Sequence, residues 1–344
     1  RQATDGLLLG PILEEFKQKR QELVNELFEL CNAANKAKGN NVFDHVPDMR
    51  ITVQGGIGTA NEDEFLREYY NVDGTGWGSP FLLVPEATNV DDGTLYELAV
   101  ATKDDYFLSN ASPLGVPFHN FRRSTSEKQR TERIAKDRPG SPCYKKFLAT
   151  NTEFTPAPIC TASRQYQDLK IDQLNEKNLP PDEYQAELSK ITDKDCLCEG
   201  LSSAALLKNN LPPSHNLTAV TICPGPNLAY FSGIFSLRDM VDHIYGRKNM
   251  LNSLHRPNLF VNELNLYVDY LKNEIEKAKK AINSKQQSFF NTFRANLLGG
   301  IKYYKEELVP YLKKESEQYI NTMLDELSSY QNALNNLTIP AVVS

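Results

Sequence analysis

The chain has 344 residues, of which 40% are hydrophobic and 24% are charged, and its formal net charge is −6. This acidic balance, with no stripe of lysine and arginine, argues against nucleic acid as a partner. No run approaches the roughly 20 apolar residues that a membrane-spanning helix needs, so no membrane association is expected. A chain of this length does not need disulfides in order to fold, which favours reduced thiols and a cytoplasmic location.

The N-terminal segment is predicted to be one long amphipathic helix over residues 7–38. Leu23, Leu27 and Leu30 recur there at spacings near 3.6, and the glycine of the Gly39-Asn40-Asn41 sequence is typical of a helix end. A short strand is predicted within 49–56, where β-branched residues are followed by a glycine turn.

Two further helices and a second strand complete an α/β pattern. The stretch 61–70 is predicted to be a helix with Asn61 as its N-cap. A strand with its own glycine turn follows over 71–83, and a short helix over 91–102. The alternation of helix and strand indicates an α/β fold with parallel strands.

The rest of the chain is expected to have a different character. Residues 139–230 are rich in proline and cysteine, with one helix near 182–192, and the mixed charges of 121–138 favour a solvated helix face. From about residue 258 the chain is predicted to be helical, with Gly299-Gly300 separating two helices and Pro310 interrupting the second. These changes predict three segments: βα units in 1–105, an irregular cysteine- and proline-rich region in 106–255, and a helical hairpin or bundle in 256–344.

Two glycine clusters carry the strongest functional signal. Gly55, Gly56 and Gly58 follow the first predicted strand, and Gly74, Gly76 and Gly78 follow the second. Bare backbone before a helix start is suited to binding a phosphate group. In a (β/α)₈ barrel, two loops after consecutive strands lie side by side and can contact one phosphate. The alternative is that these glycines only form turns.

The segments "TDGLLLGPILEEF", "ITVQGGIGT" and "DGTGWGSPFL" resemble the last part of the flavin-dependent barrels of the nitronate monooxygenase (2-nitropropane dioxygenase-like) family. The resemblance covers about the first hundred residues. It implies an FMN phosphate held by Gly55, Gly56, Gly76, Gly78 and Ser79, with Gln54 lining the flavin ring pocket. It carries over no catalytic residue, because the segment that supplies the family's histidine has no counterpart here.

This resemblance sets the expected fold and partners. The fold would be the C-terminal portion of a (β/α)₈ barrel, followed by the irregular region and the helical hairpin or bundle. Because the chain begins at Arg1 and holds only two barrel strands, we expect a processed or truncated piece. The rest of the barrel would come from an upstream segment or another chain, the substrate would be a small molecule, and exposed aromatics on the helical hairpin would favour a homo-oligomer.

The cysteines suggest a second site. Cys143, Cys160, Cys196, Cys198 and Cys223 all fall between 143 and 223, in loop-like settings or beside proline. Several thiolates on loops are how zinc and iron–sulfur sites are built, so a metal or cluster is one interpretation. Buried unligated thiols and disulfides are the others.

The histidines give little further evidence for a metal site. His215 and His243 lie in the same region, but a single histidine is more often structural than a metal ligand. His119 is the best candidate for a general acid or base by residue type alone.

Two functional hypotheses follow. The first is an FMN-dependent oxidoreductase, to which this chain supplies the flavin phosphate-binding loops and a cysteine-containing accessory region. The second is a non-catalytic scaffold or interaction module, in which the glycines form turns and the cysteines are structural or bind zinc.

Overall fold

The computed structural model describes residues 5–278 and 282–342, which divide into two compact units. The first unit contains the chain through Trp77, residues 244–247, and the chain from His255 onward. The second contains residues 78–243 and 248–254. This division differs from the three segments expected from the sequence, because the C-terminal helices share one hydrophobic core with the N-terminal elements.

The predicted parallel βαβ arrangement is present in the first unit. Strand β1 (Thr52–Gln54) pairs in parallel with β2 (Gly74–Gly76), and α3 (Ala60–Tyr69) connects them. The N-cap of α3 is Thr59 and not Asn61 as expected, because the Thr59 hydroxyl accepts the Glu62 backbone N–H at 3.2 Å. Strand β2 is shorter than predicted, since Ser79–Leu83 form a 3₁₀ turn.

The predicted helix over 7–38 is two helices. Helix α1 (Leu9–Gln18) ends at Lys19, which has φ −105° and ψ 18°, and α2 (Arg20–Ala37) begins after it. Helix α1 buries Ile12 and Leu13, whereas α2 buries none of its residues. The apolar spacing persists along both helices, so the sequence pattern alone did not reveal the break.

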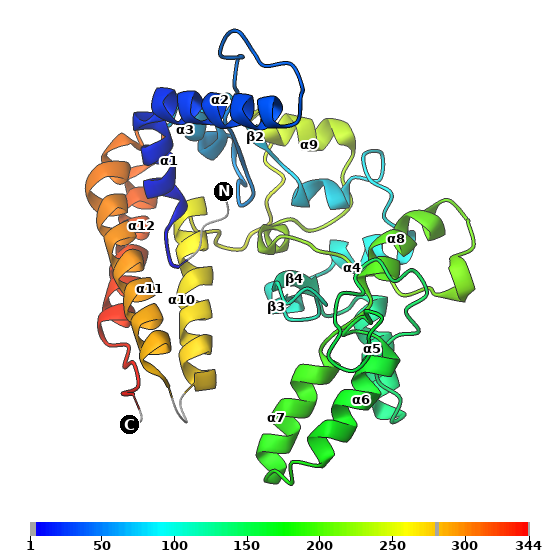
Figure 1. The fold of residues 1–344 in the computed structure, drawn as a ribbon. Coiled ribbons are helices and arrows are strands. Elements are labelled where there is room, and N and C mark those ends of the chain that lie inside the picture. Colours follow the sequence, from blue (N-terminus) through cyan, green and yellow to red (C-terminus); the bar gives the residue numbers. More distant parts are fainter. Residues whose placement is uncertain (1–4, 279–281, 343–344) are drawn as a thin grey trace. The chain divides into compact units, whose positions relative to one another are not determined.

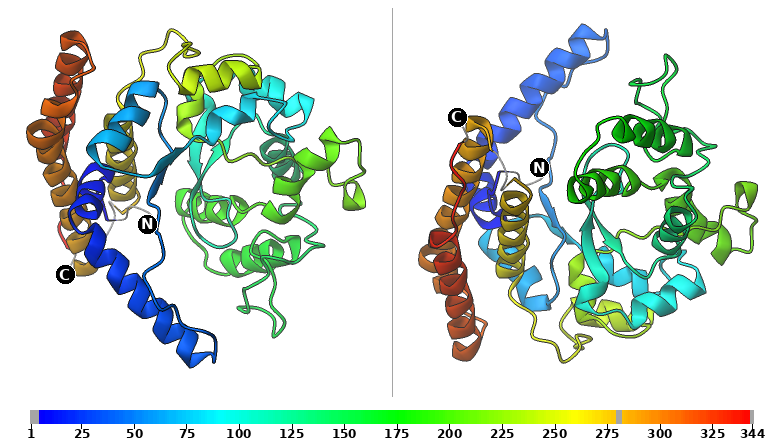
Figure 2. Two further views of the ribbon diagram at one scale, coloured as in Figure 1. Left: turned by 90° about the horizontal axis from the view of Figure 1, so that it is seen from above. Right: turned by 90° about the horizontal axis from the view of Figure 1, so that it is seen from below.

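The C-terminal part of the first unit is a small helical bundle, as expected. Helices α10 (Leu259–Ala278), α11 (Ser284–Tyr303) and α12 (Glu317–Asn335) lie side by side, with α1 against α10 and α11 (Figure 1). The adjacent α11 and α12, orange to red, can be followed in both views of Figure 2.

The helix break in this bundle lies after the two glycines and not at them. Gly299 and Gly300 lie inside α11, so the prediction that they separate two helices was wrong. Gly300 instead permits a close approach, since a Cβ there would lie 2.4 Å from Leu8 Cδ1. The interruption at Pro310 is confirmed: a π-helical turn, Tyr304–Leu308, is followed by a 3₁₀ turn, Val309–Tyr311.

One hydrophobic core joins the βαβ unit to the bundle. Leu66 and Tyr70 at α3 are buried with Phe260 of α10, Leu297 of α11 and Leu327 of α12. Burial of apolar side chains is the main favourable contribution to folding, so the two ends of the chain stabilise each other within this unit.

The second unit is mostly helical around a short hairpin. Its elements are α4 (Asp92–Ala99), β3 (Tyr106–Ser109), β4 (Phe118–Phe121), α5 (Thr125–Ala135), α6 (Arg164–Asn175), α7 (Pro181–Thr192), α8 (Leu197–Lys208) and α9 (Leu237–Ile244), the last of which ends at the boundary of the unit. Strands β3 and β4 are antiparallel. The expected helices near 91–102, 121–138 and 182–192 are present as α4, α5 and α7. Helices α6, α8 and α9 were not predicted from the sequence.

The strands found in residues 5–278 and 282–342 form two separate two-stranded sheets. This part of the chain is therefore a helix-rich α/β structure and not a closed barrel. No helix within it is both long and apolar enough to cross a membrane.

Candidate functional site

The turn after β1 has the backbone that its glycines predict. Gly55 has φ 91° and Gly56 has φ 76°, in the left-handed region that side chains disfavour. Both residues are exposed, and a Cβ added at either position would meet no atom within 4 Å. The turn therefore has open space in front of bare backbone, next to the N-terminus of α3.

The end of β2 lies beside this turn. Gln54 pairs with Gly76 in the parallel register, so the chain leaves both strands at the same edge of the sheet. A Cβ on Gly76 would lie 2.5 Å from Gln54 Cγ, which means that the Gln54 side chain crosses over Gly76. The structure thus brings together Gly55, Gly56 and Gly76, three of the five predicted phosphate contacts, and gives Gln54 a packing role.

The other two predicted contacts, Gly78 and Ser79, belong to the second unit. Gly78 is exposed and has open space around its Cα. The Ser79 hydroxyl oxygen accepts the Gly225 backbone N–H at 2.9 Å. Ser79 therefore has a structural contact within its own unit, whatever else it binds.

A buried ion pair lies beneath the glycine turn. The Arg256 guanidinium donates from Nη1 to Glu62 Oε1 at 2.7 Å and from Nη2 to Oε2 at 2.8 Å, and both side chains are at most 5% exposed. Arg256 Nη2 also donates to the Gly56 carbonyl oxygen at 2.7 Å. The Glu62 carboxylate accepts the backbone N–H groups of Gly58 and Leu259.

This ion pair fixes the turn relative to α3 and to the start of α10. Fork-to-fork pairing is the strongest arginine–carboxylate geometry, and the further N–H donors satisfy the remaining carboxylate lone pairs. A Cβ on Gly58 would lie 2.4 Å from Arg256 Nε, so Gly58 makes room for this arginine. The pair was not predicted from the sequence. Its one local signal was the Thr-x-x-Glu spacing of Thr59 and Glu62, which is typical of a helix N-terminus.

A cavity of about 260 Å³ lies in the same unit, at the start of α12. It is lined by His255, Asn258, Ser316, Gln318, Tyr319, Thr322, Met323 and Glu326. His255 Nε2 and Glu326 Oε1 are 2.9 Å apart across it. None of the predicted phosphate contacts lines this cavity.

In the second unit, two of the predicted cysteines are neighbours. The interaction with the Cys160 thiol lowers the pKa of Cys143 to about 7, and the interaction with Cys143 raises the pKa of Cys160. The Lys146 backbone N–H and the charge of Lys146 add to the effect on Cys143, whereas burial adds to the effect on Cys160. All six cysteines of the chain are free thiols in the structure.

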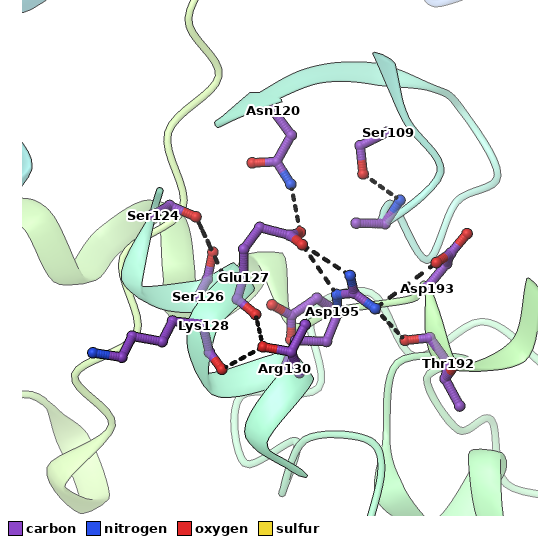
Figure 3. Close-up of polar contacts among 12 residues, drawn as sticks. Ser109, Asn120, Ser124, Ser126, Glu127, Lys128, Arg130, Thr192, Asp193 and Asp195 are labelled. Atoms are coloured by element: carbon purple, nitrogen blue, oxygen red, sulfur yellow. Dashed lines mark hydrogen bonds and ion pairs between the residues drawn. The ribbon is translucent and has the colours of Figure 1, made fainter. Parts of the chain in front are cut away.

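Cys196 is positioned by the polar network around Asp195, a residue that Figure 3 labels. Asp195 Oδ1 accepts hydrogen bonds from the Cys196 backbone N–H at 2.8 Å, from Arg133 Nη2 at 2.9 Å and from the Ser141 hydroxyl at 3.2 Å. Burial raises the pKa of Asp195, and the Arg133 charge opposes that rise. Burial likewise raises the pKa of Cys196 to about 11.

A second ion pair of α5 lies next to Asp195 in the same view. Arg130 donates to Glu127 Oε2 at 2.9 Å and to the Thr192 carbonyl oxygen at 3.2 Å (Figure 3). Asn120 of β4 donates to the other Glu127 oxygen at 2.9 Å. These contacts join the hairpin, α5 and the segment that precedes Cys196.

The remaining predicted ligands are less closely gathered. Cys198 lies two residues after Cys196, and Cys223 is an exposed residue. Burial raises the pKa of Cys223. Within residues 5–278 and 282–342, no three histidine, cysteine, aspartate or glutamate side chains are grouped so as to hold a metal ion. A zinc or iron–sulfur site at these cysteines stays a prediction.

The histidines have structural surroundings. His243 is buried, and its Nδ1 accepts the Met250 backbone N–H at 3.2 Å. His215 stacks on Tyr144 with ring centroids 3.7 Å apart. His119 lies on β4, where burial lowers its pKa. An acid or base role for His119 also stays a prediction.

The chain matches no protein-family model, and in the same comparisons it matches neither a curated protein nor a solved structure.

Proposed function

We propose that the sheet edge formed by Gly55, Gly56 and Gly76 binds the phosphate of FMN, as part of an FMN-dependent oxidoreductase of the nitronate monooxygenase-like kind. The observation that carries the proposal is the pairing of Gln54 with Gly76 in parallel strands, which brings two glycine-containing strand ends to one edge beside a helix N-terminus.

The chemistry of this edge suits a phosphate. Backbone N–H groups at a strand–turn–helix junction donate hydrogen bonds to anions, and the helix start adds a partial positive charge. The open space in front of Gly55 and Gly56 lets an oxyanion approach the backbone closely. The bound flavin would supply the redox chemistry, while these residues would hold and orient it.

A complete flavin enzyme of this kind would also need further barrel strands and a substrate. The remaining strands of a flavin barrel would be supplied by a segment outside this sequence or by another chain. The substrate would be a small molecule, and the cysteine-containing unit would be an accessory region that could carry zinc or an iron–sulfur cluster.

A titration with FMN and riboflavin, followed by flavin fluorescence, tests the proposal. We expect FMN to bind at least about tenfold more tightly than riboflavin, a difference of about 1.4 kcal/mol, because only FMN carries the phosphate. Gly56→Ala would remove most of this preference by placing a methyl group in the open space.

Gly39→Ala is the matched control. Gly39 lies in the same unit, has φ 70°, is exposed and has equally open space, so the variant carries a similar backbone cost without touching the sheet edge. Equal binding of FMN and riboflavin, or equal losses in the two variants, would contradict phosphate binding at this edge.

A non-catalytic scaffold is the second candidate function. It is favoured by the Arg256 contacts to Gly56 and Glu62, since these give the turn a purely structural purpose. Purified chain that is folded, colourless and unable to bind FMN would support it.

A further inference from the structure

Helix α2 is the least buried long helix of the first unit. It has 18 residues and buries none of them, whereas α10, α11 and α12 each bury several of theirs. It continues from α1 and extends past the bundle of α10, α11 and α12 (Figure 2). Most helical stability in proteins comes from packing of an apolar face, so α2 gains little from the rest of its own unit.

An apolar stripe runs along the outside of this helix. Leu23, Leu27, Leu30 and Ala34 follow one another at intervals of four, three and four residues, which is the spacing of the core positions in a coiled coil. Leu27 is 55% exposed, Leu30 is 60% exposed, and Ala34 is also exposed. A single exposed leucine needs no explanation, but a row of apolar side chains on one helix face indicates an interaction surface.

The segment that follows α2 is held away from this stripe. Phe43 donates its backbone N–H to Asn32 Oδ1 at 2.8 Å, and Asn32 Nδ2 donates to the Phe43 carbonyl oxygen at 3.0 Å. Successive residues of a helix are rotated by about 100°, so Asn32 lies on the side of α2 opposite to Leu27 and Leu30. The contact with Phe43 therefore leaves the stripe uncovered.

The spacing of the stripe makes α2 complementary to a second copy of itself. The intervals of four, three and four residues read the same in both directions along the helix. An antiparallel copy therefore places Leu27 opposite Leu30 and Leu23 opposite Ala34 in every layer of the contact. A two-fold contact between identical chains requires self-complementarity of this kind.

The charges of α2 favour the same orientation. Residues 22–29 contain three glutamates and no basic residue, and residues 30–38 contain two lysines and no acidic residue. All five charged side chains are exposed: Glu22, Glu26, Glu29, Lys36 and Lys38. In an antiparallel pair, the acidic half of each helix lies along the basic half of the other, whereas a parallel pair would bring like charges together.

We propose that α2 docks onto α2 of a second copy of this chain, in an antiparallel contact that makes the protein a homodimer. The stripe of each chain forms the centre of the contact. Because four apolar side chains per chain make a small interface, we expect a weak dimer with a dissociation constant on the order of 10 µM. None of the predicted phosphate contacts takes part, so the dimer does not depend on FMN binding.

Sedimentation equilibrium of the full chain without FMN, over about 1 to 200 µM, tests the proposal. We expect the mean mass of the wild type to rise from that of one chain toward that of two. Leu27→Glu places a charge in the apolar stripe and should raise the dissociation constant about tenfold or more. Because Leu27 is exposed and α2 buries no residue, this variant should keep the fold of the single chain.

Leu201→Glu is the matched control. Leu201 lies on α8 and is 56% exposed, nearly the same as Leu27, so this variant changes an equally exposed helical leucine outside the stripe. It should dimerise as the wild type does. Equal weakening by the two variants would overturn the proposal. A wild-type chain that stays monomeric throughout would also overturn it, and would leave the stripe to a different partner, such as a segment outside this sequence.

Disulfide trapping tests the orientation. In a chain that carries Cys31→Ser, the double substitution Leu23→Cys, Ala34→Cys places two thiols about 16 Å apart on one helix, too far for a bond within it. An antiparallel pair brings position 23 of one chain next to position 34 of the other. Mild oxidation and peptide mapping should therefore find these two positions linked between chains. Links that join each position to itself would show parallel packing and would contradict the proposal.

Discussion

Glu263 of α10 is a half-buried residue whose carboxylate binds the start of α1. Its two oxygens each accept the Leu9 backbone N–H at 3.0 Å, and Tyr304 donates its hydroxyl at 3.3 Å. Burial nevertheless raises its pKa to about 7, because these donors only partly offset the loss of hydration.

This shift predicts a pH dependence of stability. The folded state binds a proton that the unfolded state releases near pH 4.5, so the stabilising contribution is complete below that pH and is lost as pH rises through about 7. Glu263→Gln should abolish this decline. Between pH 5 and 8, the unfolding free energy of the wild type should fall relative to the variant by about 2 to 3 kcal/mol. Urea denaturation at both pH values measures it, and parallel curves for the two proteins would contradict it.

A second prediction at the residue scale concerns how much the buried Glu62–Arg256 ion pair contributes to stability. Replacing one partner leaves an uncompensated buried charge, so Arg256→Met should lower the unfolding free energy by about 3 to 5 kcal/mol. The double variant Glu62→Gln, Arg256→Met should lose less than the sum of the two single variants. Additive losses in a double-mutant cycle would show that the pair is not coupled.

Within helix α11, alanine substitutions at two adjacent glycines are expected to change stability in opposite directions. Gly300→Ala would force a methyl group against Leu8 and should destabilise the first unit by about 1 to 3 kcal/mol. At Gly299 a Cβ would meet no atom within 4 Å, so Gly299→Ala should stabilise the helix by up to about 1 kcal/mol. Thermal unfolding of both variants checks the contrast, and shifts of the same sign would contradict the packing described here.

The same glycines show how far the sequence can predict these elements. Local signals were sufficient for α3, α4, α7 and the parallel strands, because caps, turns and periodicity are encoded within a few residues. The Gly299-Gly300 sequence resembles a helix break, but α11 continues through both residues. Gly300 leaves space for the side chain of Leu8, which lies almost 300 residues away in the chain. Spacing within one segment carries no information about such a partner.

The candidate sites likewise combine features that local sequence determines with features that only tertiary folding determines. The left-handed turn at Gly55 and Gly56 follows from the residues themselves. The contacts of Glu62 with Arg256 and the proximity of Cys143 to Cys160 depend on tertiary folding, so sequence spacing could nominate the cysteines but could not show which of them are neighbours. The division of Gly78 and Ser79 from the other predicted phosphate contacts was equally invisible in the sequence.

At the scale of the whole molecule, the first unit is built from both ends of the chain. Val53 of β1 and Leu66 of α3 are buried in a core that α10, α11 and α12 complete. A chain that ends at Leu254 should therefore lose hydrogen-exchange protection in residues 8–76. Residues 79–243 should keep their protection, because the second unit has its own contacts. Preserved protection of α3 in the shortened chain would contradict the shared core.

The proposed FMN site lies at the sheet edge of the first unit, and selective ¹⁵N labelling of the 18 glycines tests this site directly. On addition of FMN to the full chain, we predict shifts of the Gly55, Gly56 and Gly76 amide resonances, while those of Gly39 and Gly299 stay in place. Inorganic phosphate should shift the same three amides at higher concentration. Unchanged resonances for Gly55 and Gly56 in the presence of saturating FMN would contradict the proposed phosphate site.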